Sequence, residues 1–251
     1  LGTSIPIYWL ELDKRGNSNT DERKQVINDI LKDFGNNAIS YLLADREFVG
    51  NDWFEYLQSN AINFVVRIKN NFLLEHKGET VSAHKLFKQA DTITAVTKLV
   101  KINGITVLAQ AIRSSNQELV IVISNDLQAT NLLDIYAKRW KIECLFGQLK
   151  TRGFNFEDTH ITIQERLNNL MKLLVPSFCV AYLVGLVHAS VVPIQIKKHG
   201  RQLKSYFRHG LDKLISIIQC NLQLALKIIT TCLEPNIYME KKCKKLICVM
   251  Y

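Results

Sequence analysis

Short apolar runs separated by polar turns dominate the first 70 residues of the chain. The runs over residues 5–12, 38–44 and 63–69 have the length of strands, and the second is continuously apolar, as in a strand covered on both faces. Between the first two, apolar residues recur at helical spacing over residues 26–34, and a short helix is predicted around residues 52–59. The order strand, helix, strand predicts a parallel α/β unit.

The pattern changes to Thr-, Val- and Ile-rich runs after residue 70. The runs over residues 92–101 and 105–113 flank an Asn-Gly pair, which is the dipeptide preferred in two-residue hairpin turns. Residues 119–124 form a further strand-like run. We therefore expect a mainly β insertion over residues 70–118.

Helical patterns fill the rest of the chain. Residues 128–150 contain no proline and predict a long helix, and residues 167–192 and 211–233 predict C-terminal helices. Residues 173–196 contain no Asp, Glu, Lys or Arg, which is long enough for a membrane span. Pro176 and the moderate hydrophobicity favour a buried helix instead.

The net charge of +9 resides in the second half of the chain. Residues 1–125 carry 14 basic and 14 acidic side chains, whereas residues 126–251 carry 18 and 9. Such an excess indicates either a polyanion partner or plain solubility. A basic cluster with interleaved aromatic residues over residues 197–208 is either a track for phosphates or a solvated loop, and residues 241–245 form a basic tail that we expect to be solvated.

Asp45 closes the apolar run over residues 38–44. Ligands of open α/β sheets gather at the carboxyl ends of the strands, so a carboxylate at this position is well placed to bind a metal. A turn aspartate that is hydrogen-bonded to the nearby backbone is the plainer alternative.

Four residues share one face of the predicted helix over residues 128–150. Tyr136, Arg139, Glu143 and Lys150 have offsets of 0, 3, 7 and 14, which place them within roughly 60° of each other over ~21 Å of a straight helix. Glu143 would then lie beside the buried stripe and could point towards Asp45. A solvated face with an Arg–Glu pair four residues apart is the alternative.

These residues resemble the signature of a known enzyme family. The spacing Tyr136-x2-Arg139-x3-Glu143-x6-Lys150 is similar to the motif of DDE transposases of the insertion-sequence-four family. The sequence LADREF around Asp45 resembles the second-aspartate motif of that family, and the expected strands at the chain start and after residue 63 resemble its strands. The resemblance covers about residues 2–210 in order.

The resemblance implies a ribonuclease H-like α/β fold with a mixed sheet, and the activity of cut-and-paste DNA transposition. In that family two aspartates and one glutamate hold two divalent ions, Mg²⁺ with Mn²⁺ as a substitute. Asp45 would be the second aspartate and Glu143 the glutamate. Tyr136, Arg139 and Lys150 would hold transposon-end DNA.

The resemblance also implies partners, a location and a division of the chain. The partners would be double-stranded DNA, as transposon ends and target, and a second copy in a synaptic homodimer. The location would be the bacterial cytoplasm, at the nucleoid, with no membrane. Residues 1–69 and 119–160 would form the core, residues 70–118 the insertion and residues 161–251 a C-terminal helical region.

The first aspartate of the family has no counterpart in this sequence. It lies on the first strand of the fold, and strands 1 and 2 are expected to be absent here; Asp13, in a turn, is a poor substitute. We therefore expect an N-terminally truncated chain that is catalytically inactive and folds poorly alone. A DNA-binding relic that inhibits the intact enzyme is an alternative function, and a small membrane-associated protein is a third.

Overall fold

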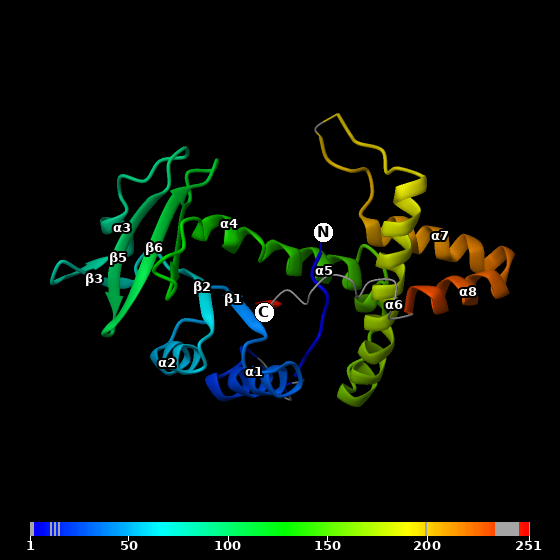
Figure 1. Ribbon diagram of the computed structural model, residues 1–251, viewed down its shortest axis with the longest axis horizontal. Coiled ribbons are helices and arrows are strands. Elements are labelled where there is room, and N and C mark those ends of the chain that lie inside the picture. Colours follow the sequence, from blue (N-terminus) through cyan, green and yellow to red (C-terminus); the bar gives the residue numbers. More distant parts are fainter. Residues whose placement is uncertain are drawn as a thin grey trace. The chain divides into compact units, whose positions relative to one another are not determined.

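The computed structural model of the chain describes residues 3–10, 12, 14, 16–198, 200–233 and 246–250 (Figure 1). It contains two compact units. The helical unit comprises Leu1–Lys14 and Lys141–Lys244, and the sheet unit comprises Arg15–Trp140 and Lys245–Tyr251. Asp13, His199 and the basic tail over residues 241–245 lie outside the described residues.

The sheet unit is built on a mixed sheet. Its described strands form one eight-stranded sheet in the order β4-β3-β5-β6-β7-β2-β1-β8. β1 pairs in parallel with both β2 and β8, and the remaining pairs are antiparallel. The mixed α/β class that the sequence predicts is therefore confirmed. The strands are β1 (Ile39–Ala44), β2 (Asn63–Ile68), β3 (Leu73–His76), β4 (Glu79–Ser82), β5 (Val96–Ile102), β6 (Ile105–Arg113), β7 (Leu119–Ser124) and β8 (Leu246–Val249).

Helices cover both faces of the central strands. Phe64 of β2 stacks on Phe54 of α2, with ring centroids 4.6 Å apart, whereas the next residue, Val65, packs in a cluster with Leu132 of α4. Successive side chains of a strand point to opposite faces, so α2 and α4 lie on opposite sides of β2. This is why the runs in β1 and β2 are largely apolar. The helices of this unit are α1 (Thr20–Phe34), α2 (Asn51–Ser59), α3 (Ala83–Leu86) and α4 (Leu132–Ala137).

The helical unit is held together by a close approach of two helices. A Cβ atom on Gly210 of α7 would lie 1.9 Å from the carbonyl oxygen of Ala181 in α6, and one on Gly185 of α6 would lie 1.8 Å from that of Tyr206. Only glycine allows this contact. Phe178 and Phe207 stack beside it, and both are fully buried. The helices are α5 (Trp140–Lys150), the 3₁₀ turn η1 (Phe156–Thr159), α6 (Gln164–Val191), α7 (Tyr206–Cys220) and α8 (Leu222–Leu233).

Helix α6 carries the uncharged stretch that the sequence analysis singles out. It is the one helix of the described residues that is long and apolar enough to cross a membrane. Its middle residues, such as Phe178, Ala181 and Tyr182, are buried in the core of the helical unit, while Leu173 and Val191 remain exposed. The helix therefore contributes one face to a protein core.

The strand expected over residues 5–12 is not observed. Of the described residues before α1, none lies in a strand. The segment instead contacts helices: the N–H of Ser4 donates to the carbonyl of Lys141 at 3.3 Å, and Nε1 of Trp9 donates to Oδ1 of Asn168 at 3.4 Å. A strand needs hydrogen bonds to a neighbouring backbone, and Pro6 has no N–H to donate to one. β1 lies between β2 and β8, and its pairing with β8 was not predicted from the sequence.

The single helix expected over residues 128–150 is interrupted. The N–H groups of Lys138 and Arg139 donate to carbonyls three residues back, at 3.2 and 2.8 Å, which is a tightened turn that ends α4 before α5 begins. At the other end, Asp126 accepts from the N–H of Gln128 at 3.1 Å and holds a turn where the helix was expected to begin.

Candidate active site

Asp45 is the first residue after β1, where the sequence places it. The N–H of Arg46 donates to its Oδ1 at 2.7 Å, and the N–H of Phe48 donates to its backbone carbonyl at 2.9 Å. These bonds fix the carboxylate at the carboxyl end of a strand whose last three residues are fully buried. About a third of the side chain, 35%, remains exposed and open to a ligand. Asp45 therefore has the backbone hydrogen bond expected of a turn aspartate. That bond uses Oδ1 and does not involve the second oxygen, Oδ2.

Arg139 is brought to that second oxygen from 94 residues away. Its Nη2 lies 3.3 Å from Oδ2 of Asp45, and the Arg139 side chain is only 13% exposed. A guanidinium that is mostly withdrawn from water and faces a carboxylate makes a charge-assisted contact. Two residues that the sequence analysis selects separately are thus neighbours in the sheet unit.

Tyr136 completes this group. Burial, and then the charge of Asp45, raise the pKa of its hydroxyl to about 12, against the opposing effect of Arg139, Arg67 and Arg46. The phenol therefore stays protonated at neutral pH and can donate a hydrogen bond. Of these arginines, Arg139 pairs with Asp45 and Arg67 pairs with Glu118.

The position of this group follows from the way α4 is anchored on the sheet. Leu132 is fully buried among Leu43, Val65 and neighbouring strand residues. Oε1 of Gln110 accepts from the N–H of Leu133 at 3.0 Å, so a strand side chain caps the first turn of the helix. Gln110 was not predicted from the sequence as a residue of this site. A polar residue in an otherwise apolar strand was its only signal.

Glu143 and Lys150 lie on α5, in the helical unit. They are seven residues apart, close to two helical turns, so they share a face about 10 Å apart along the axis. Ile142, Leu145 and Leu149 are buried, while Glu143 is half-buried and Lys150 exposed. The single straight face expected for all four residues is wrong, because α4 ends before Arg139. Asp45 and Glu143 belong to different units, and their meeting at one metal stays a prediction.

The carboxylates can be compared with the ligand set that a divalent metal needs. No group of three or more His, Cys, Asp and Glu side chains that could hold an ion occurs among the described residues. Asp45 nevertheless offers hard carboxylate oxygens, which Mg²⁺ prefers, and about a third of its side chain is exposed. Asp45 thus fits a cation chemically as one ligand of a set.

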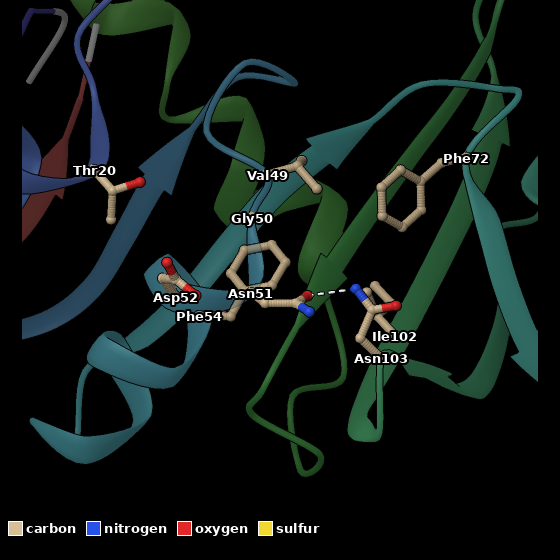
Figure 2. Close-up of a pocket in the computed structure, with 9 residues that line it drawn as sticks. All are labelled: Thr20, Val49, Gly50, Asn51, Asp52, Phe54, Phe72, Ile102 and Asn103. Atoms are coloured by element: carbon tan, nitrogen blue, oxygen red, sulfur yellow. Dashed lines mark hydrogen bonds between the residues drawn. The ribbon is translucent and has the colours of Figure 1, made fainter.

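A hollow of about 350 Å³ opens near the N-terminus of α2, in the loop that follows Asp45 (Figure 2). Nδ2 of Asn103, at the β5–β6 turn, donates to Oδ1 of Asn51 across it. Its lining combines amides with aromatic and aliphatic side chains and a single charge, so it offers no constellation for catalysis. The lining residues are Thr20, Val49, Gly50, Asn51, Asp52, Phe54, Phe72, Ile102 and Asn103.

A comparison with protein families tests the family resemblance of the sequence. The family model described as "Transposase DDE domain" matches residues 4–180, more than two thirds of the chain. The chain belongs to the DDE transposase family. No curated protein matches the chain.

The matched segment contains Asp45, Tyr136, Arg139, Glu143 and Lys150. The eight-stranded mixed sheet and the C-terminal helices of the chain are consistent with the ribonuclease H-like domain of such a transposase. The family acts on DNA and generally uses divalent metals, so membership assigns the chain to transposition as a reaction class.

Proposed function

We propose that this DDE transposase belongs to the insertion-sequence-four group and acts in the cut-and-paste movement of an insertion sequence. The observation that carries the proposal is the contact of Arg139 with Asp45 beside the neutral Tyr136, inside a segment that matches the family. Asp45 comes from one motif and Tyr136 and Arg139 from the other, and Arg139 contacts Asp45 at the end of β1.

Asp45 and Glu143 would hold the divalent ions, Mg²⁺ or Mn²⁺. When bound, such ions activate an attacking water or 3′-hydroxyl and stabilise the oxygen that leaves phosphorus. Asp45 is held for this role by the N–H of Arg46, which donates to Oδ1, and by Arg139, which faces Oδ2. Glu143 is held by the buried stripe of α5 around Leu145.

Arg139, Tyr136 and Lys150 would contact the DNA. The planar guanidinium of Arg139 matches the oxygens of a phosphate, and its burial beside Asp45 fixes its direction. Tyr136 donates from a protonated hydroxyl, and the exposed Lys150 supplies a mobile point charge. Such contacts position a duplex without reading its sequence.

The partners would be double-stranded DNA, both as element ends and as target, and a second copy of the chain in a synaptic complex. We place the protein in the bacterial cytoplasm, at the nucleoid. The excess of basic residues after residue 126 is consistent with binding to DNA.

Mn²⁺ binding followed by electron paramagnetic resonance, with and without duplex DNA, tests the metal site. Asp45→Asn and Glu143→Gln are each expected to weaken Mn²⁺ binding by at least about tenfold, since even the loss of an outer-shell partner costs that much. Asp52→Asn and Glu165→Gln are matched controls, because each removes an exposed acid of the same unit. Equal Mn²⁺ affinity in the site variants and in these controls would contradict the assignment of the carboxylates.

A further inference from the structure

The segment that joins α6 to α7 forms a hairpin that projects beyond the ends of both helices (Figure 1). We call residues 192–205 the basic hairpin. Ile196 and Gln202 form an antiparallel bridge, the N–H of Lys197 donates to the carbonyl of Arg201 at 2.8 Å, and the N–H of Leu203 donates to that of Gln195 at 2.8 Å. The segment is therefore a short two-stranded ribbon.

The turn of the basic hairpin brings three cations together. The N–H of Gly200 donates to the carbonyl of Lys197 at 2.9 Å, which closes a β-turn, and Gly200 has a φ of +80° that glycine adopts without strain. Lys197, Lys198 and Arg201 therefore lie within one turn, and all three are exposed. Their close spacing is set by the backbone.

No acid balances these cations locally. The sequence has no Asp or Glu between Glu165 and Asp212. Asp212 pairs with Lys204 at 2.6 Å and with Arg208 at 2.8 Å, at the base of the basic hairpin. Within the part of the chain that the structure describes, no acidic side chain pairs with the three cations of the turn.

Apolar side chains on the same ribbon are also exposed. Ile196 is 57% exposed and Leu203 is 47% exposed. They give the ribbon an apolar component beside its cations. Mutual repulsion of the cations would be relieved by a polyanion that covers the ribbon.

We propose that the basic hairpin is a DNA-contacting arm, in which Lys197, Lys198 and Arg201 bind phosphates of a duplex. The choice of DNA over other polyanions rests on the proposed function. A two-stranded ribbon also has the width that a major groove admits. The contact is to the backbone, so it binds without sequence preference and adds to affinity through release of counterions.

The arm is tested by fluorescence anisotropy of a random-sequence DNA duplex titrated with the full chain at several salt concentrations. The test variant is Lys197→Ala/Lys198→Ala/Arg201→Ala. The control variant is Arg166→Ala/Lys172→Ala/Lys227→Ala, which removes two lysines and one arginine that are exposed on helices of the same unit. The three hairpin substitutions are expected to make the slope of log affinity against log salt shallower by about 2.7, and the control by less than 1.

The outcomes separate this proposal from the proposed function. Equal affinity and slope in the hairpin variant and the control would overturn the arm, while leaving DNA binding by the wild-type chain intact. Failure of the wild-type chain to bind any duplex would refute the proposed function itself. Phosphatidylserine vesicles serve as the second probe: loss of vesicle binding in the hairpin variant with unchanged DNA affinity would show a membrane arm and overturn the proposal.

Discussion

Replacing Gly210 by alanine should break the closest helix contact of the helical unit. The added methyl group would lie 1.9 Å from the carbonyl oxygen of Ala181 and 2.4 Å from the backbone nitrogen of Gly185. Both are backbone atoms of α6 and cannot rotate away, so α6 and α7 must separate by an ångström or more. Overpacking of this kind costs roughly 3 kcal/mol at the upper end of its usual range.

Alanine also favours the helix, and this gain must be subtracted. A glycine-to-alanine change inside a helix contributes about 1 kcal/mol. The net loss is therefore about 2 kcal/mol, which lowers the melting temperature of a protein of this size by roughly 4–8 °C. Thermal unfolding followed by circular dichroism at 222 nm measures the change.

Gly147→Ala is the matched control. Gly147 also lies inside a helix, but a Cβ atom there meets only the flexible end of Arg152, at 3.0 Å. Its melting temperature should stay the same or rise. If Gly210→Ala were as stable as Gly147→Ala, the reasoning about backbone contact would be wrong.

Three further predictions follow from individual contacts. Asn19→Ala should destabilise the sheet unit by about 1 kcal/mol in urea unfolding, because the Asn19 side chain accepts the N–H of the third residue of α1. Burial, and then the charges of His209 and Lys213, lower the pKa of His188 below its usual 6.5. The unfolded chain therefore takes up a proton at this side chain before the folded chain does, and the folded state loses stability as the pH falls below 6.5. Acidification should thus lower the melting temperature, and should lower it less in His188→Gln. Arg139→Gln should weaken duplex binding and make the salt slope shallower by about 0.9.

Each of these has a control in the same protein. Asn17→Ala removes an exposed amide outside the cap, His84→Gln an exposed imidazole in α3, and Arg166→Gln an exposed guanidinium on α6. Matching effects in a control and its test variant would show that the named contact is not the cause.

Strands were predicted well from the sequence where an apolar run is bounded by clear turn residues. The apolar run of β1 between Ala38 and Asp45, and the Asn103-Gly104 turn between β5 and β6, appear in the structure as expected. In these cases local chemistry decides the outcome, since a turn dipeptide and a run covered on two faces need no distant information.

Features that depend on distant partners were not predictable in the same way. The run at Ile5 has the composition of a strand, but its described neighbours are helices, and composition does not name a neighbour. The break after Ala137 has no glycine or proline to announce it. It was therefore missed, and with it the placement of Tyr136 and Glu143 on two different helices. The pairing of Asp45 with Arg139 was reachable only through the family motif.

The pairing of β8 with β1 has a consequence for the making of the protein. About 200 residues separate the two strands along the chain. At bacterial and eukaryotic synthesis rates, roughly 10–40 s pass between the emergence of β1 from the ribosome and that of β8. Throughout that interval one rim of a nascent sheet presents free peptide groups to any passing strand. Newly made chains should thus depend on holdase chaperones until β8 has been translated.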